Sequence, residues 1–91
     1  MPRFEPRDPD FEAKVRDSFG RQTTMRTLGA VMGRVEPGEM EIEMPYRADL
    51  AQQHGFIHGG IVTSILDSAC GYAAFSLSAP DSAVLTVEYK V

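Results

Sequence analysis

The sequence contains no tryptophan, a single cysteine and no long hydrophobic run. The lone cysteine, Cys70, excludes an internal disulfide framework and is typical of a reducing compartment. No apolar run approaches the roughly 20 residues that a membrane-spanning helix requires. Residues 1–10 are charged and rich in proline, unlike a signal peptide. These absences predict a cytoplasmic protein that does not associate with a membrane.

An excess of basic residues is also lacking. Nine Lys and Arg residues stand against thirteen Asp and Glu residues, which gives a net charge of −4. No basic stripe follows a predicted helix and no aromatic residues alternate with basic ones, so nucleic-acid binding has little support. A chain of 91 residues forms at most one small domain. Without disulfides, such a domain needs a very good core or a partner.

The N-terminal part of the chain predicts a short amphipathic helix over residues 8–20. The pair Asp8-Pro9 is typical of a helix start, with Asp as N-cap and Pro at the first helical position. Apolar residues then recur at every fourth position: Phe11, Val15 and Phe19. We expect this helix to cover an edge of a larger structure.

Three strands are also predicted. Residues 30–36 and the stretch from Glu39 to Met44 flank Pro37-Gly38, which suits the centre of a type II turn. In the second strand, methionine and isoleucine alternate with glutamate, so one face is buried and the other is acidic and solvated. After a loop over residues 46–57 and a long helix, residues 82–91 alternate as a third strand.

The long helix, predicted over residues 59–78, carries the most information. Asp67 is its only charged side chain, and small residues surround it. A surface helix of this length would carry several charges, so we expect a sheet on one side and a partner or ligand on the other. The side expected to face the sheet is apolar: Ile61, Val62, Ile65, Leu66, Ala69, Tyr72 and Ala73.

Two features of this helix suggest chemistry. His58-Gly59-Gly60 leads into it, and the N–H groups at a helix start suit an oxygen that carries partial negative charge. The glycines could instead serve a tight turn. Asp67 has no other charged residue near it on the helix. It is either a functional carboxylate or an acid that caps a loop or pairs with an arginine.

The spacing of these two features predicts a shared site. Gly59 and Asp67 are eight residues apart on one helix, which corresponds to about 12 Å along its axis. One carbonyl group cannot contact both within a single chain. If both act on one substrate, they come from different subunits, so we expect an active site at a dimer interface.

The stretch LAQQHGFIHGG over residues 50–60, continued by residues 61–66 and then Asp67-Ser68-Ala69, resembles the signature of the hotdog-fold thioesterases. It is most similar to the phenylacetate-degradation type and its hydroxybenzoyl-CoA thioesterase relatives. The resemblance covers residues 28–91 and leaves residues 1–27 as an N-terminal helix and lead-in. It implies an α+β fold, with an antiparallel sheet wrapped around a long central helix. The last strands of such a sheet are expected beyond Val91, so this domain is expected to be C-terminally incomplete.

The resemblance also implies roles for individual residues. Asp67 matches the catalytic acid, as nucleophile or general base, and the Gly59 N–H polarises the thioester carbonyl. His58 helps to hold the carbonyl end of the site, Gln52 positions substrate or water, and Thr86 orients the water. No metal or prosthetic group is implied, and coenzyme A enters as part of the substrate. Four further residues are candidates for substrate binding: Gly60, Phe56, Ile57 and Ser68. Of these, Phe56 and Ile57 could equally belong to the core.

The sequence therefore predicts hydrolysis of an acyl-CoA or aryl-acyl-CoA to free acid and CoA by a homodimer or a dimer of dimers. Two alternatives stay open: a non-catalytic acyl-CoA-binding module and an inactive, truncated chain. A hotdog dehydratase would need a catalytic histidine paired with an acid in another motif, which the sequence lacks. The acyl group itself is not identified by the sequence.

Overall fold

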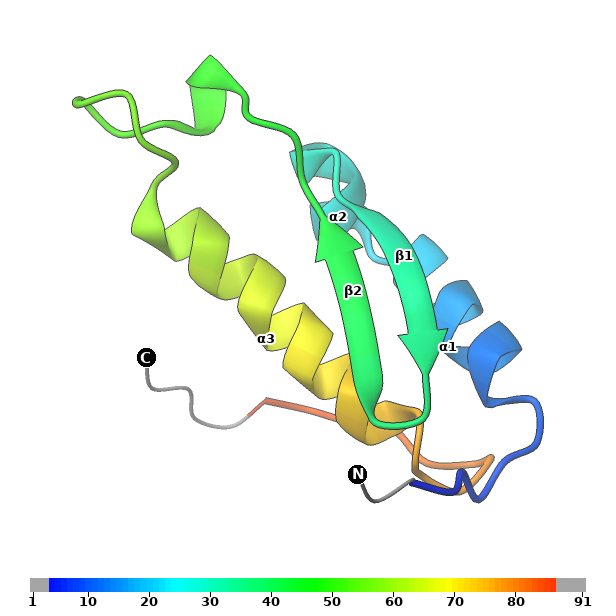
Figure 1. The fold of residues 1–91 in the computed structure, drawn as a ribbon. Helices are drawn as coiled ribbons and strands as arrows, with labels where there is room; N and C mark the ends of the chain where they lie inside the picture. The colour runs from blue at the N-terminus through cyan, green and yellow to red at the C-terminus, as the bar shows by residue number, and fades with distance from the viewer. Residues whose placement is uncertain (1–3, 87–91) are drawn as a thin grey trace.

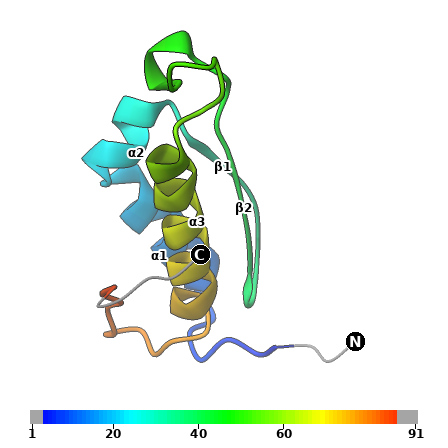
Figure 2. The ribbon, with the colours of Figure 1, turned by 90° about the vertical axis from the view of Figure 1, so that its left-hand side faces the viewer.

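The computed structural model describes residues 4–86 and has an α+β architecture (Figure 1). Its elements in chain order are α1 (Phe11–Gly20), α2 (Thr23–Leu28), β1 (Val31–Glu36), β2 (Glu39–Glu43), a short 3-10 helix (Ala48–Leu50) and α3 (Gly59–Phe75). Figure 2 shows two layers, with the β1–β2 hairpin on one side and the helices on the other. The α+β class and the long central helix predicted from the sequence are confirmed.

The hairpin follows its sequence pattern closely. β1 and β2 pair antiparallel, and Glu36 faces Glu39 across the turn. Gly38 has a φ of +77°, the left-handed value that a type II turn requires at that position. The glutamates of β2 are exposed, while Met40 and Ile42 between them are partly buried against the helices. The predicted hairpin is confirmed, and β1 begins one residue later than expected.

Two apolar clusters form the core. The first contains Val15 of α1, Val35 of β1 and Tyr72 of α3, so it joins three elements. The second is built around Met25, Leu28 and Ala30 and receives side chains from β2 and α3. The predicted stripe of α1 packs as expected, since Phe11 and Phe19 flank Val15 in these clusters.

Helix α2 was not predicted from the sequence. It has six residues, too few for an apolar period to be recognised, and it buries just Met25 and Leu28. Its C-terminal signal is clearer, because Gly29 adopts a left-handed φ of +72° directly after the last helical residue.

The start of α1 differs from the prediction. The helix begins at Phe11, and Asp8 is not its N-cap. The Asp8 carboxylate instead accepts a hydrogen bond from the Asp10 N–H at 2.9 Å. Aspartate side chains often accept a hydrogen bond from the backbone N–H two residues further on. Because Asp8 forms such a turn, the helix starts at Phe11 and not directly after Asp8.

The predicted third strand is wrong for residues 82–86, which are irregular, and its remainder, 87–91, lies outside the described residues. A strand needs a sheet edge to pair with, whereas this segment runs beside α3. Val84 and Leu85 are 48% and 87% exposed. Alternation alone therefore did not suffice to form a strand here.

The predicted apolar face of α3 is only partly correct, and the helix itself ends at Phe75 rather than near residue 78. Ile61 and Ile65 pack against the second core cluster. Val62 and Leu66 remain 44% and 43% exposed. Each helical residue advances by about 100°, so a narrow hairpin covers one stripe and leaves the neighbouring stripe open.

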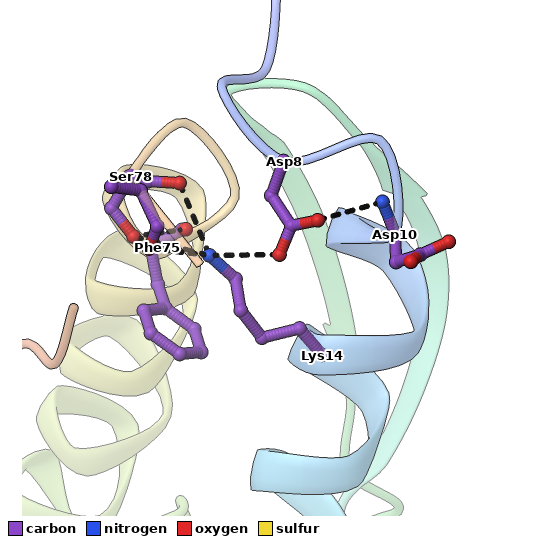
Figure 3. Close-up of polar contacts among 6 residues, drawn as sticks. Asp8, Asp10, Lys14, Phe75 and Ser78 are labelled. Carbon is purple, nitrogen blue, oxygen red and sulfur yellow. Dashed lines mark hydrogen bonds and ion pairs between the residues drawn. The ribbon is translucent and has the colours of Figure 1, made fainter. Parts of the chain in front are cut away.

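Lys14 of α1 bonds to residues that directly follow the C-terminal end of α3 (Figure 3). Its ammonium donates to the carbonyl oxygens of Ser78 and Ala79 at 3.2 and 3.3 Å. It also lies 3.8 Å from a carboxylate oxygen of Asp8 and 4.5 Å from the centre of the Phe75 ring. A lysine near the end of a helix satisfies carbonyl groups that have no partner within the helix. This Lys14 cluster holds the N-terminal helix in place against α3.

Candidate active site

The start of α3 presents one backbone donor to solvent. The imidazole Nδ1 of His58 accepts a hydrogen bond from the Gly60 N–H at 2.9 Å and so caps the helix. Because Nδ1 is the acceptor, the neutral ring carries its proton on Nε2. Within residues 4–86 the Gly59 N–H donates to no protein group. Of the two adjacent glycines, Gly59 therefore has the donor that remains available to a ligand oxygen.

The loop before α3 fixes the position of this donor. Ala51 and Ile57 form an isolated antiparallel bridge, and the His58 N–H bonds the Leu50 carbonyl at 2.9 Å. His58 and Gly60 line a shallow depression together with Asp49, Leu50, Ala51 and Ile61. We call this place, with the Gly59 N–H beside it, the oxyanion half-site.

Gln52 and Phe56 lie in the same loop and point elsewhere. The Gln52 side-chain oxygen accepts a hydrogen bond from the His54 N–H, so it folds back on its own loop. The Gln52 N–H bonds the Phe56 carbonyl at 2.7 Å. The Phe56 side chain is 72% exposed, and Ile57 is partly buried at the bridge. Gln52, Phe56 and Ile57 line neither of the cavities described here.

Asp67 lies in the middle of α3, partly buried at the wall of a cavity of about 370 Å³. One of its carboxylate oxygens accepts a hydrogen bond from the Thr86 hydroxyl at 2.8 Å. No lysine or arginine of the described chain forms an ion pair with it. The simple explanation of Asp67 as one half of an ion pair is therefore not supported within residues 4–86. We call this place the Asp67 half-site, and Ser68 and Thr86 also line it.

Residues of α1 and of the junction between α1 and α2 also line the Asp67 half-site. They were not identified from the sequence as site residues. Ser18, Arg21 and Gln22 form one wall of the cavity. Gln22 donates through its side-chain nitrogen to the Tyr72 hydroxyl at 2.9 Å. The available signal was weak: Ser18 in α1 and Gln22 just after it are uncharged polar residues four positions apart, where the exposed positions of the helix are mostly charged.

The two half-sites are separated along a single unbroken helix. α3 runs without interruption from Gly59 to Phe75, so Gly59 and Asp67 lie about 12 Å apart along its axis. The structure therefore brings Asp67 together with Thr86 and Ser68, and it brings His58 together with the two glycines. It does not bring the two groups together within one chain.

The chain is similar in sequence and in structure to known proteins. Residues 54–91 match the family model of the thioesterase superfamily. The crystal structure of a thioesterase family protein from Silicibacter pomeroyi is 60% identical, with a TM-score of 0.86, and the match covers 88% of this chain and 59% of that one. A protein of Saccharolobus solfataricus whose name classes it with the esterases is 34% identical over 44 residues, which are 48% of this chain and 31% of that protein.

The resemblance to the hotdog-fold thioesterases is thus confirmed, both in sequence and in structure. The fold is that of the class, with a hairpin packed on a long helix that carries the glycine pair and the acid. The chain spans about three fifths of the Silicibacter pomeroyi structure and about a third of the Saccharolobus solfataricus protein. No helix within residues 4–86 is long and apolar enough to cross a membrane.

Proposed function

We propose that the chain hydrolyses an acyl-CoA or aryl-acyl-CoA thioester to free acid and CoA, in an active site shared between two copies. The observation that carries the proposal is the separation of the two half-sites on α3. Each half-site holds what the other lacks: a backbone donor at Gly59, and at Asp67 a carboxylate that forms no ion pair with any of residues 4–86. The match to the thioesterase superfamily supports thioester hydrolysis in general.

In this proposal, the Gly59 N–H donates to the thioester carbonyl oxygen and stabilises the negative charge that develops there. The positive end of the α3 dipole adds to this effect. The Nε2–H of His58 is available to the same end of the substrate. Phe56, exposed in the preceding loop, offers an apolar surface to the CoA part of the substrate.

The partner's Asp67 acts on the carbonyl carbon in one of two ways. As a general base, it removes a proton from water while the water oxygen bonds to the carbon; the C–S bond then breaks and the CoA sulfur takes up a proton. As a nucleophile, its oxygen first displaces CoA to form an anhydride, which water hydrolyses. In either route, the Thr86 hydroxyl holds the carboxylate in a defined orientation through its hydrogen bond.

The test is release of free thiol from a panel of acyl-CoAs by the wild-type chain and by Asp67→Asn. We expect kcat to fall by at least about a hundredfold in the variant, because it loses the base or nucleophile. Asp81→Asn is the matched control, since Asp81 is an exposed carboxylate that lines neither half-site.

A folded Asp67→Asn protein that keeps full turnover of every accepted thioester would refute the proposal. Tight binding of acyl-CoAs by a wild-type protein that hydrolyses none of them would favour the non-catalytic binding module instead.

A further inference from the structure

The cavity beside Asp67 has a wall that comes from outside the central helix. Gln22, at the junction of α1 and α2, lines it together with Tyr72 of α3. The cavity volume of about 370 Å³ is near the lower end of the range for small-molecule sites. The acyl part of a thioester held at Asp67 would therefore meet this wall after a short distance.

Gln22 is held rigidly. Its side-chain nitrogen donates to the Tyr72 hydroxyl at 2.9 Å and lies 3.5 Å from the Ser68 hydroxyl. The Tyr72 hydroxyl also shares a hydrogen bond with Ser18 at 3.1 Å. Tyr72 is 7% exposed, and its ring packs edge-on against Phe19 with the centroids 6.0 Å apart. The polar groups of this wall are therefore fixed in place before any ligand arrives.

The Lys14 cluster, shown in Figure 3, links α1 to the segment after α3 and so limits movement of α1, which carries Ser18 of this wall. Ser18 follows Lys14 by about one turn of α1, and Gln22 follows two residues after the end of that helix. Because Lys14 is anchored at the far end of α3, α1 cannot slide along α3 without breaking these contacts.

The chemistry of this wall disfavours an alkyl chain. Gln22 contacts α3 at Tyr72 and at Ser68, and Ser68 is next to Asp67 in sequence. Gln22 and Ser68 both line the cavity, and methylene groups pressed against these polar side chains would remove them from solvent without offering hydrogen bonds in return. A short acyl group does not extend to this wall, and a polar acyl group can form hydrogen bonds with it.

We propose that Gln22, held by Tyr72 and Ser68, determines the acyl specificity of the Asp67 half-site: it favours short or polar acyl groups and discriminates against long unbranched alkyl chains. The inference rests on the proposed thioesterase function and adds a substrate class to it.

The experiment compares kcat/KM for butyryl-CoA and decanoyl-CoA in the wild-type chain and in Gln22→Met. Methionine keeps the length of the side chain and removes its hydrogen bonds. We expect the decanoyl-to-butyryl ratio to rise about tenfold, which is within the range that apolar pocket contacts give. Tyr72→Phe, which removes the hydroxyl that Gln22 bonds, should shift the ratio in the same direction. Thr24→Ala is the control, because Thr24 is an exposed residue of α2 outside the cavity.

A purely structural role for Gln22 would slow both substrates equally. An unchanged ratio in both variants, with activity on butyryl-CoA still dependent on Asp67, would overturn this inference and leave the proposed function intact. If the wild-type chain hydrolyses neither thioester, the proposed function fails. Calorimetric binding of the matching non-hydrolysable CoA thioethers then decides: the same shift in Kd ratio supports the role of Gln22, and equal ratios or no binding overturn it.

Discussion

At the start of α3, two neighbouring glycine N–H groups differ: one donates to a side chain and the other does not. His58 occupies the Gly60 N–H through its Nδ1 atom and leaves the Gly59 N–H directed at solvent. The motif alone could not distinguish the two donors, because both glycines suit a helix start. The hydrogen bond from Gly60 also explains the histidine: it caps the helix in the place where serine or aspartate is more common.

This arrangement allows a substitution that removes one donor and little else. Gly59→Pro deletes the Gly59 N–H at the first helical position, where proline is well tolerated. A side-chain carbon at this position would meet nothing within 4 Å. His58 has a ψ of 134°, which suits a residue before proline. We expect kcat for thiol release to fall about a hundredfold or more, as when an oxyanion donor is lost, with the urea unfolding midpoint nearly unchanged.

Gly20→Ala is the control for this variant, since a side chain there also meets nothing within 4 Å. A Gly59→Pro protein that is folded and fully active would show that the Gly59 N–H takes no part in the reaction.

At the scale of elements, α1 is attached to α3 mainly through the Lys14 cluster and the first core cluster. The Lys14 and Asp8 side chains are 14% and 10% exposed, and the ammonium also bonds the last carbonyls after α3. Removing one member of a buried pair leaves the other without its partner, which costs far more than loss of an exposed pair.

We therefore expect Lys14→Met to lower the free energy of unfolding by about 3 kcal/mol. Arg34→Met, which breaks the exposed pair with Glu36, should lower it by less than about 1 kcal/mol. Urea unfolding followed by circular dichroism measures both. Equal losses in the two variants would show that the Lys14 cluster does not anchor α1.

The elements also show where sequence patterns succeed. The hairpin was predicted because its turn and its alternation agree, and each is a local property of the chain. Residues 82–86 alternate as clearly and form no strand, because a strand depends on a pairing edge that the local pattern does not contain. α2 escaped prediction because six residues are too few to show a helical period.

At the scale of the whole molecule, the proposed site requires two copies of the chain. Val62 and Leu66 leave an apolar stripe of α3 exposed, and the two half-sites lie on one unbroken helix. A partner that brings its Asp67 to the first copy's Gly59 makes two such sites in a symmetric dimer.

A mixing experiment tests this arrangement. Asp67→Asn and Gly59→Pro are each expected to be inactive alone. In a mixed dimer, the intact Gly59 of one subunit and the intact Asp67 of the other form one complete site. Unfolding and refolding equal amounts together should restore about a quarter of wild-type thiol release, since half of the dimers are mixed and each has one working site. A mixture that stays inactive, although mass measurement shows mixed dimers, would place the whole site within one chain.

The resemblance of the sequence to a known family implied the class of the fold, and the sequence by itself determined the hairpin, the central helix and the two features that α3 carries. These are set by local spacing: a period of two or of 3.6 residues, a Pro-Gly turn, and eight residues between a glycine and an acid. The tertiary structure alone decided which stripe of α3 is covered and which glycine donor is available. It also decided that Ser18 and Gln22 lie beside Asp67, roughly 45 to 50 positions further along the chain. Such contacts depend on how helices pack across the core, and no local period in a single sequence records that packing.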